Sequence, residues 1–152
     1  MTAVFPERKL PYIFLEDVAI ADVAFEAWGL DLEALFAAAA DATLNVMVND
    51  LNSVSAIVER SVSLEPEPID LLLLNYLQEI IFYKDAERLL LRTRDVKISG
   101  QGESYTAVGV LAGEELDMNR HDLVVDVKAV TLHQFRVEKT DRGWEAFVIL
   151  DI

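Results

Sequence analysis

Residues 127–152 read VKAVTLHQFRVEKTDRGWEAFVILDI, and this stretch decides the fold. Two β-rich runs, 127–139 and 144–151, flank the sequence TDRG at 140–143. A short loop containing glycine between two such runs is typical of a β-hairpin. We therefore predict that the chain ends in an antiparallel hairpin whose second strand runs to the end of the sequence.

The last two residues, Asp151 and Ile152, give this hairpin a chemical property as well. A strand that ends in this way can bring the side chain of Asp151 close to the terminal carboxylate of Ile152. Two carboxylates in one place repel each other unless a cation or a basic group lies between them. The end of the hairpin is therefore a candidate site for a positive charge.

Two segments upstream predict helices, 31–48 and 68–84. Asp31 is a suitable N-cap, and Pro68 suits the first turn of a helix. The second helix is apolar over much of its girth, which indicates burial on more than one side. Further strands are expected at 12–15, 20–28, 54–64, 89–99 and 104–111. This order predicts an α+β fold, with two helices packed on antiparallel β-sheet in a single domain spanning 1–152.

Details of this fold also follow from the pattern of residues. Pro66 is expected to end the strand at 54–64, and the acidic segment 113–126 is expected to be a loop or a short helix. The largest contributions to the core are predicted from Phe25, Leu35, Phe36, Leu72, Leu73, Tyr76, Ile80, Phe135 and Phe147.

Composition excludes several classes of function. The 152 residues carry a net charge of −14, which disfavours direct binding to phosphate backbones or anionic lipid. The absence of cysteine removes disulfides, thiolate metal sites and thiol nucleophiles. The start of the chain lacks the pattern of a signal peptide, and no run is apolar enough to span a membrane, so we expect a cytoplasmic protein.

Few residues can perform chemistry. The two histidines are His121, in a polar segment that assigns it no role, and His133. Alternation places His133 on one strand face with Thr131 and Val137, which favours a hydrogen-bonded structural residue over a catalytic one. Carboxylates remain. Asp22 alternates outward from an apolar strand, and together with Asp151 and the terminal carboxylate of Ile152 it would suit a hard cation such as Ca²⁺ or Mg²⁺. The alternative is that these acids are simply solvated.

The two ends of the chain resemble a known family. VKAVTLH at 127–133 and GWEAFVILDI at 143–152 are similar to the C-terminal signature of the archeases, in which VKAVTYH and a terminal DI are typical. FLE at 14–16 followed by AIADVAFEAWG at 19–29 is similar to the family segment FLEHTADIGIRAWG. The helical segments LDLEALFAAAADA and LNYLQEIIF fit as well, so the resemblance covers essentially the whole chain.

The resemblance implies a small α+β protein that is not itself an enzyme but activates an RtcB-type RNA ligase. Such a ligase joins a 3′-phosphate or 2′,3′-cyclic phosphate end to a 5′-hydroxyl in tRNA splicing and RNA repair, and the activator promotes its guanylylation and turnover. Carried over to this chain, the family's divalent-cation ligands correspond to Asp22, Asp151 and Ile152.

The chain departs from the family pattern around these ligands. Ala19 and Ile20 stand where the family has His-Thr, or Asp17 and its neighbours do if the gap is placed differently, and either placement loses the histidine. Leu132 stands where the family has tyrosine. Two alternatives therefore accompany the activator hypothesis: a metal-dependent enzyme acting on a phosphorylated substrate, and a protein-binding scaffold without metal.

Overall fold

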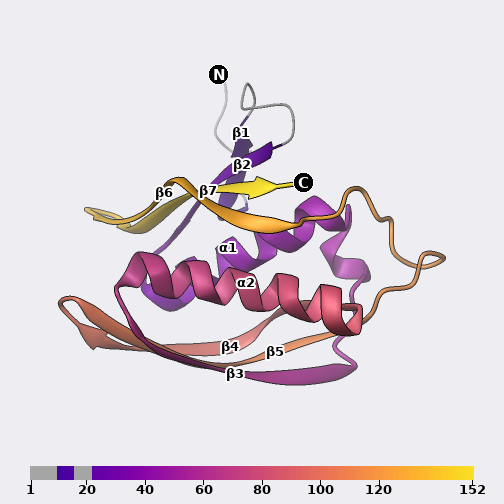
Figure 1. The fold of residues 1–152 in the computed structure, drawn as a ribbon, viewed down its shortest axis with the longest axis horizontal. Helices are drawn as coiled ribbons and strands as arrows, with labels where there is room; N and C mark the ends of the chain where they lie inside the picture. The colour runs from indigo at the N-terminus through magenta and orange to yellow at the C-terminus, as the bar shows by residue number, and fades with distance from the viewer. Residues whose placement is uncertain (1–9, 16–21) are drawn as a thin grey trace.

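The computed structural model describes residues 10–15 and 22–152, and they form three layers (Figure 1). Two helices lie between a four-stranded sheet and a three-stranded sheet. The elements are β1 (Tyr12–Leu15), β2 (Asp22–Gly29), α1 (Leu32–Met47), the 3₁₀ turn η1 (Leu51–Ser53), β3 (Val58–Glu67), α2 (Ile69–Glu87), β4 (Leu89–Gln101), β5 (Ser104–Glu115), β6 (Ala129–Thr140) and β7 (Gly143–Asp151). The predicted fold class, two helices on antiparallel sheet, is confirmed.

The four-stranded sheet has the order β1-β2-β7-β6, and every neighbouring pair is antiparallel. The terminal hairpin forms as predicted, with Thr140 and Gly143 as the pair that closes its loop. Gly143 has a φ of 129°, a conformation that other residues rarely adopt. The expected start of the second strand at Ile20 lies outside the described residues.

Both helices contact strands of both sheets, which explains their apolar girth. α1 begins after Asp31, whose side chain accepts a hydrogen bond from the backbone N–H of Ala34 at 2.8 Å. Its run of small residues lies inside the core, where Ala38, Ala39 and Ala40 are all buried. α2 extends three residues past the predicted end at Lys84 and stops at Arg88, which takes a left-handed conformation.

The three-stranded sheet has the order β3-β5-β4 and corrects two predictions. β3 runs through Pro66 to Glu67, with a register shift after Leu64, because an edge strand needs no hydrogen bond from the proline nitrogen on its open side. β5 continues to Glu115, so the segment 113–126 begins as strand and only its later part is loop.

The core is confirmed for most of the predicted residues and wrong for one. Phe25 of β2 is fully buried, and so are Phe36, Leu73 and the other predicted core residues of the two helices. Phe135 packs only at the edge of the core. Phe147 lies on the outer face of β7 beneath the guanidinium of Arg136, 5.2 Å from the ring centre, because Ala146, Val148 and Leu150 are the residues that face the helices.

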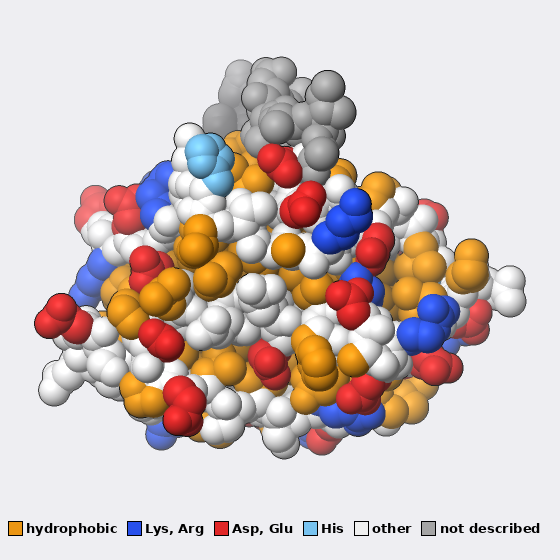
Figure 2. Space-filling model, in the orientation of Figure 1, with side chains coloured by type: hydrophobic (Ala, Val, Ile, Leu, Met, Phe, Trp, Pro, Cys, Tyr) orange, Lys and Arg blue, Asp and Glu red, His pale blue; other side chains and the backbone are white. Residues whose placement is uncertain are grey.

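Acidic side chains are distributed over the surface in the view of Figure 2, among apolar and fewer basic ones. In the described part of the chain, no helix is long and apolar enough to cross a membrane.

Candidate functional site

Two of the predicted site residues lie opposite each other at one end of the four-stranded sheet. Asp22 is the first residue of β2 and Asp151 the last of β7, and the two are Cα partners in the antiparallel register. Ile152 follows directly, and all three residues are half-buried. The prediction that these two strands lie side by side is confirmed. Cross-strand partners have Cβ atoms about 5 Å apart, so the two carboxylates repel each other.

On the outer face of the sheet, a largely buried row of residues lies next to these acids. The pairings align Asp22, Asp151 and Ala129 in one row, and the next row on the same face consists of Ala24, Ile149 and Thr131. Ala24 is 0% exposed and Ile149 is 3% exposed. Charges beside such a dry row are poorly screened, which strengthens both their repulsion and their attraction for a cation.

Among the described residues, neither Asp22 nor Asp151 takes part in an ion pair. In the same described part of the chain, no group of three or more His, Cys, Asp or Glu side chains that could hold a metal ion is present. The register sets the side-chain carboxylates of Asp22 and Asp151 at this sheet end, and Ile152 follows directly.

The position of His133 differs from the prediction. The register of β6 against β7 is broken between Thr131 and Arg136, and His133 lies exposed within this bulge. Gln134 in the bulge has a φ of 57°, which is uncommon for a residue other than glycine. The alternation that seemed to place His133 on one face with Thr131 and Val137 is therefore interrupted between them.

The other histidine belongs to a buried cluster that the sequence did not reveal. His121 Nδ1 accepts a hydrogen bond from the backbone N–H of Asp117, and its Nε2 lies 3.1 Å from Glu114 Oε2. Arg120 Nη2 donates to the same carboxylate at 2.6 Å, and the backbone N–H of Ser55 donates to it at 2.7 Å. Both ring nitrogens of His121 are therefore engaged in holding the loop after β5, so this histidine is structural.

The electrostatics of this cluster favour the ionised carboxylate. Burial alone would raise the pKa of Glu114. The hydrogen bonds from Ser55 and His121, with the charge of Arg120, outweigh burial and hold this pKa below its usual value.

A buried lysine positions the start of β6. Lys84, near the end of α2, donates hydrogen bonds to the carboxylates of Asp85 and Asp126 and, at 2.9 Å, to the backbone carbonyl of Val127. Burial acts to lower the pKa of Lys84, and the hydrogen bonds to the two aspartates more than reverse this, so the pKa is raised. The contact ties the chain just before Ala129 to the helix layer and so fixes β6 beside Asp151.

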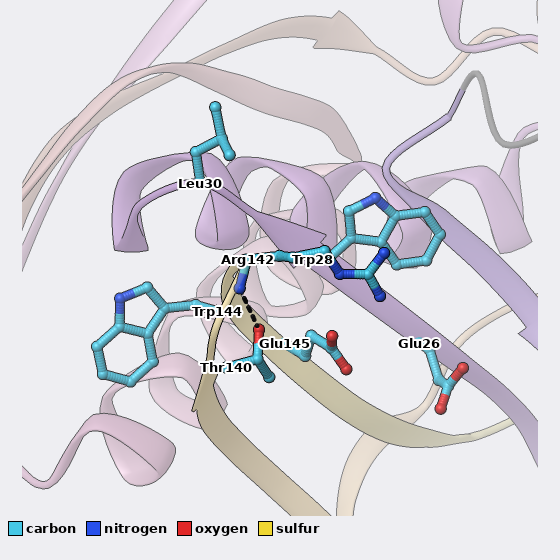
Figure 3. A pocket seen from close by; sticks show the side chains of 7 residues that line it. All are labelled: Glu26, Trp28, Leu30, Thr140, Arg142, Trp144 and Glu145. Carbon is cyan, nitrogen blue, oxygen red and sulfur yellow. Dashed lines mark hydrogen bonds between the residues drawn. The ribbon is translucent and has the colours of Figure 1, made fainter.

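A cavity lies at the opposite end of the same strands (Figure 3). It measures about 410 Å³ and is lined by Glu26, Trp28, Leu30, Thr140, Arg142, Trp144 and Glu145. In Figure 3 the two indole rings lie apart, with Arg142, Thr140 and Glu145 drawn between them. The backbone N–H of Arg142 donates to Thr140 Oγ1 at 3.2 Å. The residues that line this cavity include no histidine.

The three layers define a small α+β protein, and Asp22 and Asp151 face each other at one end of its four-stranded sheet. A family model of the archeases matches residues 12–152. The chain therefore belongs to the archease protein family.

Curated relatives agree over nearly their whole length. A protein archease of Pyrococcus abyssi is 36% identical over 133 residues, which is 87% of this chain and 93% of the relative. One of Archaeoglobus fulgidus is 35% identical over 143 residues, covering 94% of this chain and 100% of the relative.

Two solved structures share the fold. The solution structure of protein 1598 of Methanobacterium thermoautotrophicum matches with a TM-score of 0.79 and 36% identity, covering 93% of this chain and 99% of that one. The crystal structure of a Thermotoga maritima archease, described as a possible chaperone, matches with a TM-score of 0.55. Its identity is 15%, with 88% of this chain and 93% of that one covered, so it supports the fold alone.

The residues at the sheet end fit a divalent cation. The donors are all oxygen, as hard cations such as Ca²⁺ and Mg²⁺ require. One further observation agrees with this donor set. Among the described residues, Thr131 Oγ1 is the one buried side-chain nitrogen or oxygen atom without a hydrogen-bond partner. It lies in the row next to Asp151 on the same face.

Proposed function

We propose that this protein is a non-catalytic activator of an RtcB-type RNA ligase, and that it promotes guanylylation and repeated turnover of the ligase. Membership in the archease family supports the proposal. The single observation that carries it is the register that sets Asp22 against Asp151 on neighbouring strands, next to the last residue of the sequence.

In this proposal Asp22, Asp151 and the terminal carboxylate of Ile152 hold a divalent cation, Ca²⁺ or Mg²⁺. The cation supplies the positive charge that lets three anionic groups occupy one sheet end. The chain's own residues then do two things: they fix the ends of β2 and β7 in one geometry, and they keep that surface in the shape that the ligase recognises.

The remaining groups favour an activator over an enzyme. A metal-dependent hydrolase or transferase needs a general base or a nucleophile beside the ion. His121 is enclosed by Glu114 and the backbone of Asp117 and is not available. His133 lies in an exposed bulge of an edge strand, with no carboxylate paired to it among the described residues.

The partner's chemistry follows from the same proposal. A surface with a net charge of −14 repels RNA, so the activator would contact the ligase and leave the RNA to the ligase. The ligase is expected in the same compartment, the cytoplasm.

The test is a ligation assay with the RtcB-type ligase of the same cell, GTP, a divalent metal and an RNA pair bearing 3′-phosphate and 5′-hydroxyl ends. We expect added protein to speed transfer of labelled guanylate to the ligase and to increase the number of joined ends per ligase. The protein alone should join nothing and take up no label.

Two matched variants sharpen this assay. Asp22→Asn should abolish most of the stimulation, whereas Asp141→Asn, which makes the same change in the exposed loop of the terminal hairpin, should preserve it. Equal stimulation by both variants would contradict a role for the acid pair. Failure of the wild-type protein to stimulate its ligase would contradict the proposed function.

A further inference from the structure

Thr131 carries a feature that the ligands carried over from the family do not explain. Its hydroxyl oxygen is buried and has no hydrogen-bond partner, alone in this among the side-chain nitrogen and oxygen atoms of the described residues. A buried hydroxyl without a partner loses its hydrogen bonds to water and gains none in return. Such a group in a well-packed protein calls for an explanation, and an ion that completes its coordination is one.

The register places this hydroxyl beside the acid pair. Thr131 is the Cα partner of Ile149, and Asp151 is two residues farther along β7, so the side chains of Thr131 and Asp151 emerge on the same face. Diagonal neighbours of this kind have Cα atoms about 7–8 Å apart, with Cβ atoms somewhat closer. Oxygen ligands bind Ca²⁺ at about 2.3–2.6 Å, so one ion can be shared by donors several ångströms apart.

The neighbours of Thr131 across the sheet offer its hydroxyl no hydrogen-bond partner. Its two neighbours across the sheet, Ile149 and Ala24, are buried and have no side-chain polar atom. The register of β6 breaks immediately after Thr131, so the strand holds this residue in place and then departs from β7. Thr131 is thus the last regularly paired residue of β6 on the site side of the bulge.

We propose that Thr131 contributes its hydroxyl oxygen as a neutral ligand of the cation held by Asp22, Asp151 and the terminal carboxylate of Ile152. This inference rests on the proposed function for the identity of the anionic ligands. It adds a donor that lets a hard cation approach its preferred six or more oxygens with fewer waters. It also assigns a purpose to a hydroxyl that otherwise only destabilises the fold.

The proposal predicts two effects of opposite sign for Thr131→Val, which replaces the hydroxyl by a methyl group of similar size. In metal-free buffer with chelator, the melting temperature of the variant should rise, because a buried unpartnered polar group is removed. In calorimetric titrations with Ca²⁺ alone and with Mg²⁺ alone, the affinity for the preferred ion should fall about 10- to 100-fold.

Two control variants separate a ligand from a packing residue. Thr131→Ser keeps the oxygen and should retain cation affinity within a few-fold of wild type. Thr106→Val makes the same substitution on β5 of the other sheet and should leave cation affinity unchanged. A general loss of stability would lower the metal-free melting temperature and the affinity together, so it cannot imitate the opposite signs.

The outcomes distinguish the two proposals. If wild-type protein binds a cation and Thr131→Val binds it equally well, Thr131 is not a ligand, and the acid pair stands without it. If Thr131→Val melts below wild type in chelator, the hydroxyl has a partner in the protein and the inference is overturned. If wild-type protein binds neither ion, that result contradicts both the cation site and the role of Thr131 as a ligand, whatever the ligase assay shows.

Discussion

Two pairs of like charges face each other across the outer surface of the same sheet, and their surroundings differ. At one end Asp22 is the partner of Asp151, and at the other Glu138 is the partner of Glu145. Glu138 accepts a hydrogen bond from Arg136 Nε at 2.8 Å, so a cation of the chain compensates that end. The aspartate pair has no such cation among the described residues and has a buried, unpartnered hydroxyl nearby.

The difference indicates where an external cation should bind. The glutamate end has space for a ligand, because a cavity of about 410 Å³ lies there with both tryptophans of the chain in its lining. The aspartate end has the uncompensated charge, since neither Asp22 nor Asp151 forms an ion pair among the described residues. A metal ion is small and needs oxygen donors at a fixed distance, so charge is the better guide to its site than volume.

The largest expected effect comes from a substitution in the helix layer, which supports both ends of the four-stranded sheet. Leu73→Ala should lower the free energy of unfolding by about 2–5 kcal/mol, because this fully buried side chain lies on α2 between the two sheets. Chemical denaturation measures this loss. The increase in melting temperature on adding cation should persist in the variant, since neither acid pair is changed. A loss of stability below about 1 kcal/mol would mean that the side chains around Leu73 can close into the space left by the missing methyl groups.

A smaller effect is expected at Glu114, a carboxylate whose partners are all supplied by the chain. Glu114→Gln should cost about 1–3 kcal/mol at neutral pH, because Arg120 and His121 lose their charged acceptor.

The pH dependence of that cost follows from the pKa. The pKa of Glu114 is lowered in the folded protein from the ordinary value of 4.5, so folding favours the ionised form. Its contribution is therefore fully present above about pH 4.5 and is lost as pH falls through the lower folded-state value. Urea unfolding of wild type and variant across this window should show the two stabilities converging toward acid pH. A difference that stays constant or grows toward acid pH would contradict the assignment.

The smallest effect is expected at the glutamate end. Glu145→Gln removes one member of a like-charge pair and should change stability by only a few tenths of a kcal/mol, in the stabilising direction. Cation affinity, measured by calorimetric titration, should equal that of wild type. The same acid-to-amide change at Asp22 should lower it about 10- to 100-fold. Matching losses from both variants would show nonspecific attraction by a surface of net charge −14.

Much of the sheet that carries the site could be predicted from the sequence. The hairpin was marked by the loop at 140–143, and alternation in Asp22–Gly29 placed Asp22 on the outer face. The pairing of these strands follows because their apolar faces cover the same helix. Composition also indicated that α2 would be covered on more than one side.

The errors arise where the local pattern does not determine the neighbours. Alternation continues smoothly through His133, yet β6 breaks there, because a bulge on an edge strand depends on a single partner strand. Phe147 is as apolar as a core residue but shares its face with Arg136, and the ring is covered by that side chain. Glu114 accepts a hydrogen bond from the backbone N–H of Ser55, which lies in a distant segment of the sequence, so no local spacing predicts the contact.

The orphan hydroxyl could not be predicted from the sequence either. A threonine in a β-strand is ordinary, and only the structure shows that Thr131 Oγ1 is enclosed without a partner. Whether the family's cation ligands carry over to Asp22, Asp151 and Ile152 likewise stays a prediction, and it depends on a carboxylate that belongs to the backbone terminus.

The central claim is that the terminal carboxylate of Ile152 joins Asp22 and Asp151 in holding a divalent cation, and a comparison of two extended forms tests it most directly. A short C-terminal extension converts that carboxylate into an amide, whereas an N-terminal extension of the same sequence leaves it intact. Calorimetric titration with Ca²⁺ and with Mg²⁺ should give wild-type affinity for the N-terminal form and about 10- to 100-fold weaker binding for the C-terminal form. Equal affinities of the two extended forms would contradict the claim.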